Sequence, residues 1–157
     1  MSALAVTLQH ADIESEAALR LIAALNAELE ARYPEDGANF FSLDPAEVAP
    51  GQGAFLLALV DGESIGCGAI RRRDTEVAEI KRMYVVPRHR GQGIGRAVLA
   101  QLEAEARLLG IVRLVLETGD RQPEASALYR SSGFSEIPCF GEYAGAPLSL
   151  CMGKDLD

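Results

Sequence analysis

Metal-binding and disulfide-forming residues are scarce in this sequence. It contains two histidines and three cysteines, and no two cysteines form a C-x-x-C pair. The odd number and wide spacing of Cys67, Cys139 and Cys151 argue against a disulfide framework and against a thiolate zinc site. We therefore expect three buried, reduced thiols and no bound metal.

Long hydrophobic runs are also missing. No stretch approaches the roughly 20 apolar residues that a membrane-spanning helix needs, and the first residues contain no basic leader followed by an apolar segment. We therefore expect a cytoplasmic protein. Its 157 residues correspond to one domain, expected over residues 1–157, and its 48% hydrophobic and 24% charged residues exclude disordered and collagen-like classes.

The charge is unevenly distributed along the chain. The net charge is −8, which argues against general nucleic-acid binding. Residues 71–96 nevertheless contain eight Arg or Lys and three Asp or Glu, a local charge of +5 that leaves −13 on the rest of the chain. This segment could be a solvated arginine-rich turn, but it also suggests a small polyanion as partner.

The hydrophobic pattern predicts alternating strands and helices. We expect strands over residues 4–8, 54–60, 64–71, 75–86 and 111–117, with a further strand pair within 134–154. The first helix should begin at residues 12–16, end before Pro34 and bury a stripe of Leu19, Ile22, Leu25 and Leu29. The second should bury Ile94, Val98, Leu102 and Ala106, and the third should span residues 123–132.

This order of elements predicts an α+β fold with a mixed, mainly antiparallel sheet. Asp61-Gly62 is a hairpin signal, so residues 54–86 should form an antiparallel meander. The strand, helix and strand that follow should form a parallel βαβ unit. Residues 34–53 are rich in Pro, Gly, Asp and Asn, include one capped helical turn at 44–48, and could cover a cleft.

A glycine-rich loop lies where the fourth predicted strand meets the second helix. Gly91, Gly93 and Gly95 alternate there, so the backbone can turn tightly and its N–H groups are left uncovered at the positive end of a helix. Such a loop binds phosphate or pyrophosphate. The P-loop pattern fails because no Gly-Lys-Ser or Gly-Lys-Thr follows, and the dinucleotide pattern G-x-G-x-x-G fails because Arg96 occupies its last position.

The loop resembles the coenzyme A motif [QR]-x-x-G-x-[GA] of the GNAT superfamily of acyl-CoA-dependent N-acetyltransferases. Two overlapping frames fit this motif, one beginning at Arg88 and one at Arg90. Residues 78–85 resemble the fourth strand of that family, and residues 125–134 resemble its late A-x-x-L-Y-x-x-x-G-F helix.

The resemblance covers about residues 4–155. Residues 66–70, 116–119 and 138–143 are similar to a small, single-domain bacterial subgroup, whose acceptors the resemblance does not identify. It implies a three-layer α/β/α fold in which the central sheet splays between its fourth and fifth strands. It also implies that acetyl-CoA binds as acyl donor and that the pantetheine arm pairs with the fourth strand like an additional strand.

The resemblance implies a role for particular residues of this chain. Met83 N–H would hold the developing oxyanion, Tyr129 would protonate the departing thiolate, and Glu79 would accept the proton of the amine. Glu79 could instead be a strand carboxylate paired with Lys81, Arg82 or a nearby arginine, in which case Glu117 or ordered water would be the base. Tyr129 could instead be a packed core residue. The coenzyme-binding residues would be Met83, Tyr84, Val85, Arg88, Arg90, Gly91, Gln92, Gly93, Ile94, Gly95, Arg96, Gln122 and Tyr129.

The sequence departs from the family at Gln122, where Asn is usual; Gln can still donate to the pantetheine amides. The resulting hypothesis is an acetyl-CoA-dependent N-acetyltransferase that acts on a primary amine of a small molecule by direct attack. Acetylation of a protein or peptide, and a non-catalytic acyl-CoA-binding module, remain as alternatives. We expect no metal, nucleic-acid or membrane partner, and leave a homodimer open.

Overall fold

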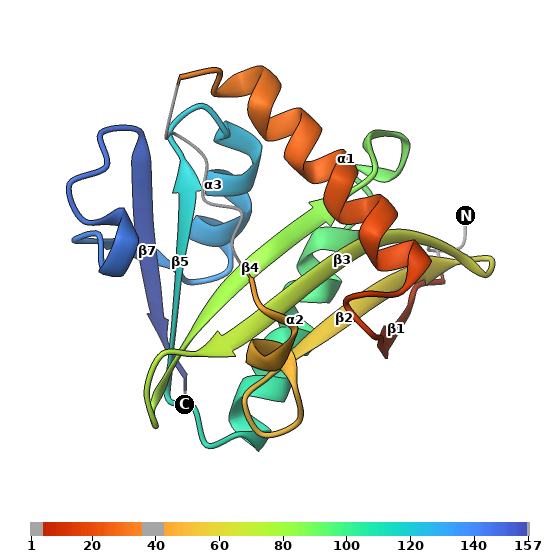
Figure 1. Cartoon of the computed structure of the whole chain (residues 1–157), viewed down its shortest axis with the longest axis horizontal. Helices are drawn as coiled ribbons and strands as arrows, with labels where there is room; N and C mark the ends of the chain where they lie inside the picture. The colour runs from red at the N-terminus through yellow and green to blue at the C-terminus, as the bar shows by residue number, and fades with distance from the viewer. Residues whose placement is uncertain (1–4, 36–42, 157) are drawn as a thin grey trace.

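A computed structural model describes residues 5–35 and 43–156 of the chain. These residues form one seven-stranded sheet with the strand order β1-β2-β3-β4-β5-β7-β6 (Figure 1). The strands are β1 (Thr7–His10), β2 (Gly53–Val60), β3 (Glu63–Arg72), β4 (Val77–Val85), β5 (Arg113–Gly119), β6 (Ser135–Ile137) and β7 (Ser149–Asp155). The α-helices are α1 (Glu16–Arg32), α2 (Ile94–Leu108) and α3 (Pro123–Ser131), and short 3₁₀ turns are η1 (Pro45–Val48), η2 (Pro87–His89) and η3 (Gly141–Tyr143).

The predicted α+β fold is confirmed. Strands β2, β3 and β4 form an antiparallel meander, and β4 and β5 are parallel. Asp61 and Gly62 connect β2 to β3 with φ values of 51° and 78°, as expected for a tight hairpin turn. Strands β6 and β7 supply the predicted final antiparallel pair. The first strand lies at Thr7–His10 rather than at residues 4–8, and residue 4 is outside the described part.

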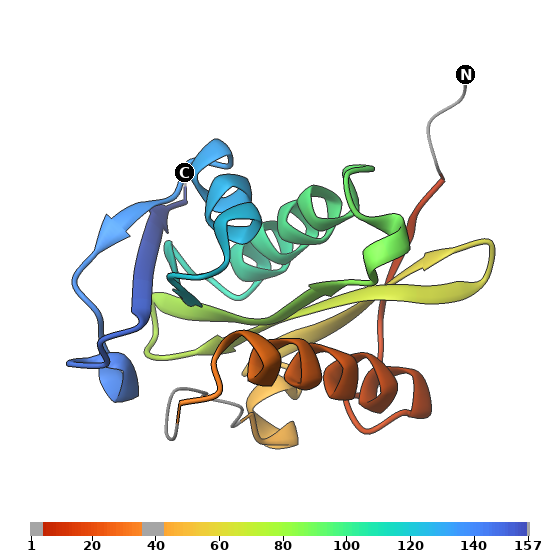
Figure 2. The ribbon, with the colours of Figure 1, turned by 90° about the horizontal axis from the view of Figure 1, so that it is seen from above.

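Helices cover both faces of the sheet, so the predicted three layers are confirmed. Figure 2 shows α1 on one face and α2 with α3 on the other. The buried side of α2 consists of the predicted Ile94, Val98, Leu102 and Ala106, together with Leu99 and Glu103. The apolar side chains of this set pack against apolar residues of β2, β3, β4 and β5.

The predicted apolar stripe of α1 is partly wrong. The buried residues of this helix are Ala18, Leu21 and Leu25, and Leu19 is 54% exposed. Residues 17–25 contain Ala, Leu or Ile at every position except Arg20. A helix that is apolar on most sides gives no single periodic stripe, so packing against the sheet selects the face.

Two of the three cysteines depart from the expectation. Cys139 and Cys151 form a disulfide with a Cα–Cα distance of 5.1 Å, whereas Cys67 is buried and free as predicted. The pairing of β6 with β7 places Ile137 opposite Cys151, and Cys139 follows two residues later. This register depends on tertiary structure, which cysteine spacing does not reveal.

None of the helices in the described ranges is long and apolar enough to cross a membrane. Residues 36–42, which belong to the segment predicted to cover a cleft, lie outside the described residues. Within the rest of that segment, the predicted capped turn is present as η1. The Asp44 side chain accepts a hydrogen bond from Ala46 N–H, and the Glu47 side chain accepts one from Asp44 N–H.

Candidate active site

The parallel pairing of β4 with β5 stops before either strand ends. Residues 77–80 of β4 pair with residues 113–116 of β5, but β4 continues to Val85 and β5 to Gly119. The two strands therefore separate beyond Ile80, and the predicted splay is confirmed (Figure 1). From this point one edge of β4 has no neighbouring strand among the residues that the structure describes.

Two N–H groups of β4 face this open edge. On the other edge, Val86 N–H donates to Ile65 O at 2.9 Å. Successive N–H groups of an extended strand alternate between its two edges. The N–H groups of Val85 and Met83 therefore point to the side from which β5 has departed.

A β-bulge reorients β4 at the same place. Cys67 lies opposite Tyr84 and Ala69 lies opposite Lys81, so Arg82 and Met83 together oppose Gly68 alone. Arg82 adopts a left-handed backbone conformation with φ of 59°. Bulges of this kind commonly redirect a side chain next to an active site.

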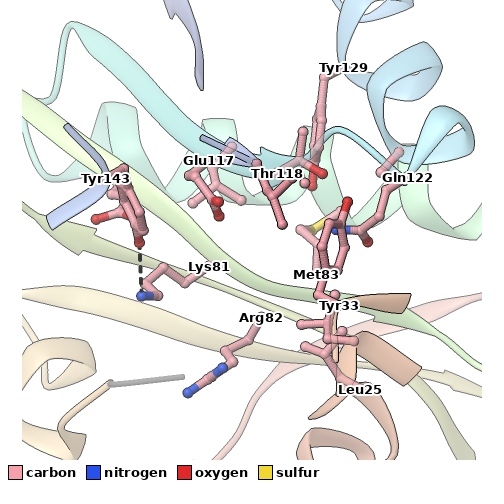
Figure 3. Close-up of a pocket in the computed structure, with 16 residues that line it drawn as sticks. Leu25, Tyr33, Lys81, Arg82, Met83, Glu117, Thr118, Gln122, Tyr129 and Tyr143 are labelled. Atoms are coloured by element: carbon pink, nitrogen blue, oxygen red, sulfur yellow. Dashed lines mark hydrogen bonds between the residues drawn. The ribbon is translucent and has the colours of Figure 1, made fainter. Parts of the chain in front are cut away.

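A pocket lies between the separated strands (Figure 3). It is built from the C-terminal half of α1, the middle of β4, the end of β5, helix α3 with the residue before it, and η3 with the segment after it. The lining residues are Leu25, Leu29, Tyr33, Glu79, Ile80, Lys81, Arg82, Met83, Glu117, Thr118, Gly119, Gln122, Ala125, Tyr129, Tyr143 and Leu148.

Glu117 and Tyr129 enter this pocket from β5 and α3. The Glu117 carboxylate accepts a hydrogen bond from Ser149 Oγ at 2.7 Å. Burial raises the pKa of Glu117 above its ordinary value, although Ser149 and Lys81 oppose the shift. Burial, and then the nearby Glu117 carboxylate, raise the pKa of Tyr129. Both pKa shifts favour the protonated form, so the phenol of Tyr129 is kept as a hydroxyl that can donate a proton.

Glu79 lies on the same wall, but its oxygens are already engaged. Oε1 accepts hydrogen bonds from Arg71 Nε at 3.1 Å, Arg71 Nη2 at 3.0 Å and Arg73 Nη1 at 3.0 Å. Oε2 accepts one from Tyr143 Oη at 2.6 Å. The residue is 1% exposed. Register explains the main pair, because Arg71 lies opposite Glu79 on β3.

Tyr143 joins this cluster to a second buried cation. Lys81 Nζ donates to Tyr143 Oη at 3.1 Å, drawn as a dashed line in Figure 3. Burial lowers the pKa of Lys81, while the Glu79 carboxylate partly opposes the shift. Arg71 also bonds Glu47 of η1 and Glu142 of η3, at 2.9 and 3.1 Å. The pocket wall is therefore held by a network that spans four elements.

The glycine loop after β4 leaves the N-terminus of α2 uncapped. Gly93 is the N-cap with φ of 83°, and no side chain caps the helix. In the described part of the chain, the N–H groups of residues 91–96 donate no hydrogen bond. A Cβ placed on Gly95 would lie 3.3 Å from Leu128 of α3, so this helix end packs against the pocket's α3 side. Free amides at a helix N-terminus attract anions.

The arginines around this loop have partners within the protein. Arg88 pairs with Glu63 at 2.7 Å, and Arg90 pairs with Glu28 at 2.9 Å. Arg90 Nε also donates to Val85 O at 2.8 Å, and Arg96 donates to the hydroxyls of Ser131 and Ser132. Arg88 is 60% exposed at its side chain, so a bound anion could replace its surface partner at little energetic cost.

The structure gathers part of the predicted site around the pocket and part beside it. Glu79, Met83, Gln122 and Tyr129 line the pocket, as does the alternative base Glu117. Tyr84, Val85 and residues 88–96 lie beyond it on β4 and the glycine loop. The Tyr84 side chain is buried in the cluster between α1 and the sheet.

The sequence predicted no contact with substrate or coenzyme for Tyr143, Lys81 or Arg82, all of which line the pocket. Lys81 and Arg82 were possible partners of Glu79, but the structure pairs Glu79 with Arg71 and Arg73 instead. The segment 138–143, which resembles a bacterial subgroup, was the one signal for Tyr143. Lys81 and Arg82 stood within the cationic segment, but their inward placement depends on the bulge in β4. A basic pair in a strand carries no local sign that a bulge will bury it.

Comparisons with known proteins agree with this geometry. The chain is 41% identical over 153 residues to an IAA acetyltransferase of Azospirillum brasilense, covering 96% of this chain and 98% of the relative. A crystal structure of a candidate acyl-CoA N-acyltransferase from Klebsiella pneumoniae superimposes with a TM-score of 0.83 at 35% identity, covering 97% and 98% of the two chains.

A more distant structure shares the fold. It is a GNAT family acetyltransferase from Elizabethkingia anophelis with acetyl-CoA bound, at 20% identity and a TM-score of 0.69, covering 96% of this chain and 98% of that one. The sequence profile described as the acetyltransferase (GNAT) family matches residues 18–134, which is most of the chain. This match, the full-length relative and the splayed sheet together show that the chain belongs to the GNAT family of acetyltransferases.

Proposed function

We propose that the protein transfers an acetyl group from acetyl-CoA to a primary amine of a small molecule, by direct attack in a ternary complex. The observation that carries this proposal is the open edge of β4 beside the uncapped N-terminus of α2. The name of the Azospirillum brasilense relative, an IAA acetyltransferase, supports a small-molecule acceptor. Membership of the family supports acetyl transfer.

The residues present fit acetyl-CoA. The free N–H groups of residues 91–96, with Arg88 and Arg96 beside them, suit the pyrophosphate. The N–H groups of Met83 and Val85 suit the carbonyl oxygens of an extended pantetheine arm, to which they would donate. Gln122, which lines the pocket at the start of α3, offers a further amide to that arm. When bound, acetyl-CoA supplies an activated thioester.

Within the ternary complex, three groups of this chain would act on the reacting atoms. Met83 N–H would donate to the thioester oxygen as negative charge develops there, a contribution of about 3 kcal/mol in comparable sites. Glu117 would take the proton of the attacking amine, because its oxygens are less engaged than those of Glu79. Tyr129 Oη would give its proton to the departing sulfur.

An acceptor screen tests the proposal. Purified protein is incubated with acetyl-CoA and a panel of small amines, and with a peptide that has a free N-terminus and a lysine. Free thiol is followed with a colorimetric reagent, and products are identified by mass spectrometry. We expect amine-dependent thiol release and a product that is one acetyl group heavier.

Two outcomes would contradict the proposal. Acetylation of the peptide with no small amine accepted would identify a protein acetyltransferase. Tight coenzyme A binding by calorimetry, with no acceptor stimulating thiol release, would identify a non-catalytic binding module.

A further inference from the structure

Arg82 is unusual in its backbone conformation. Among non-glycine residues in the described ranges, only Asp61 and Arg82 have positive φ values, and Asp61 is in a hairpin turn where such values are ordinary. Arg82 lies within strand β4, where the left-handed conformation costs about 1–2 kcal/mol. Such backbone outliers are concentrated at functional sites.

The Arg82 side chain also lacks a partner in the part of the chain that the structure describes. Its Nε is buried and, within residues 5–35 and 43–156, makes no hydrogen bond. The guanidinium forms no ion pair with any carboxylate of those residues. Burial without an acceptor is costly for a guanidinium, and it lowers the pKa of Arg82. Among the described residues, the positive charge of Arg82 in this pocket is therefore not paired with a carboxylate.

The nearby carboxylates are occupied by other groups. Glu79 is held by Arg71, Arg73 and Tyr143, and Glu117 accepts its hydrogen bond from Ser149. Lys81 donates to the neutral hydroxyl of Tyr143 and forms no ion pair within the described ranges. Lys81 and Arg82 thus both line the pocket without a carboxylate partner among the described residues.

We propose that Arg82, assisted by Lys81, binds a carboxylate on the acceptor, so that the substrate is a zwitterionic amine of the amino-acid type. This inference rests on the proposed acetyl transfer. A guanidinium matches a carboxylate in a two-pronged, charge-assisted hydrogen bond. In Figure 3 the charged ends of Lys81 and Arg82 lie away from Tyr129 and Gln122, where the coenzyme is expected.

The other pocket walls suit the remaining parts of such an acceptor. Leu25, Leu29 and Leu148 offer apolar contacts to a side chain, and Glu117 is placed to receive the proton of the amine. The net charge of −8 would attract any cationic amine, whereas Lys81 and Arg82 inside the pocket would select an amine that also carries an anion.

Matched compounds test this specificity. Phenylalanine, leucine, glutamate and lysine are each compared with the amine that remains after loss of the α-carboxylate. We expect kcat/KM to be about 10 to 100-fold higher for the better amino acids than for their decarboxylated partners, as for the loss of one charged hydrogen bond. Equal values within every pair would overturn the proposal.

The Arg82→Gln variant assigns the effect to this side chain. Gln keeps a β-carbon at the same φ, so the backbone cost is unchanged and only the guanidinium is lost. We expect KM for the amino acid to rise about 10 to 100-fold, with little change for the decarboxylated amine or for acetyl-CoA. The control Arg130→Gln removes one exposed positive charge outside the pocket. It should change neither the KM for the amino acid nor the KM for the decarboxylated amine. If Arg82→Gln raised KM equally for an amino acid and for its decarboxylated amine, the result would contradict the proposal.

A binding measurement separates this inference from the proposed activity. N-acetylphenylalanine and N-acetylphenylethylamine, which represent products with and without the carboxylate, are titrated into wild type and Arg82→Gln by calorimetry. Preference of wild type for the carboxylate, lost in the variant, supports the carboxylate site even when no amine is acetylated. Equal binding of both compounds by wild type refutes the site even when acetyl transfer is established.

Discussion

The hydroxyl of Tyr129 is a single group whose role a conservative change tests directly. We expect Tyr129→Phe to lower kcat by about 10² to 10⁴-fold, because a proton donated only in the transition state contributes little to ground-state binding. Coenzyme A affinity, measured by calorimetry, should stay within about twofold. Full turnover of Tyr129→Phe at every pH tested would make this tyrosine a packing residue.

Glu117 should control the pH dependence. A general base works when deprotonated, so kcat/KM should rise as pH increases through the pKa of Glu117. Burial raises that pKa, so the rise should occur at higher pH than for an ordinary glutamate. In Glu117→Gln we expect this rise of kcat/KM with pH to vanish and kcat/KM itself to fall about a hundredfold.

The same pH profile distinguishes the two carboxylates. Glu79→Gln disturbs a buried network, so it should lower the free energy of unfolding. The rise of kcat/KM with pH should remain in this variant. If the rise of kcat/KM with pH persists in Glu117→Gln and disappears in Glu79→Gln, the base is Glu79. If the rise of kcat/KM with pH persists in both variants, the base is ordered water.

The N-terminus of α2 offers a test with a closely matched control. Gly93 and Gly110 flank the two ends of this helix, have φ values of 83° and 79°, and have open space where a Cβ would stand. Glu at either position carries the same backbone cost and the same charge. We expect Gly93→Glu to weaken coenzyme A binding about tenfold or more, and Gly110→Glu to leave it unchanged. Calorimetry showing equal affinities for the two variants would place the phosphates elsewhere.

The network around Arg71 should stabilise the packing of η1 and η3 against the sheet. Removing this cation leaves Glu79 buried with one fewer countercharge, so we expect Arg71→Ala to lower the free energy of unfolding by about 3 kcal/mol. The exposed pair of Arg130 and Glu136 has an N–O distance of 3.9 Å, so Arg130→Ala should cost less than about 1 kcal/mol. Urea denaturation followed by circular dichroism measures both. A loss below 1 kcal/mol for Arg71→Ala would contradict this account.

Elements with strong local patterns were predictable from the sequence. The face of α2 follows directly from Ile94, Val98, Leu102 and Ala106, and the β2–β3 turn follows from Asp61-Gly62. The buried face of α1 was not predictable, because this helix is apolar on most sides and tertiary packing determines which of its residues are buried. Local periodicity is informative where one face of an element alone is apolar.

Across the whole molecule, the site was predictable where it depends on chain order and unpredictable where it depends on register. The positions of the glycine loop and of Tyr129 along the chain, and the splay between β4 and β5, were expected from motifs whose order in the sequence resembles that of the family. The bond of Arg71 to Glu79, the disulfide of Cys139 with Cys151 and the buried guanidinium of Arg82 each depend on how strands far apart in the sequence align. A shift of one residue in register would turn the side chains of a strand to its opposite face.

Initial-rate kinetics tests direct acetyl transfer between two bound substrates most directly. Acetyl-CoA and the best acceptor are varied together, thiol release and acetylated amine are both quantified, and the protein is checked for covalent acetylation by mass spectrometry. The account predicts intersecting double-reciprocal lines, one acetylated amine per thiol released, and an unmodified protein. Parallel lines with an acetylated protein, or thiol release that does not depend on the amine, would contradict it.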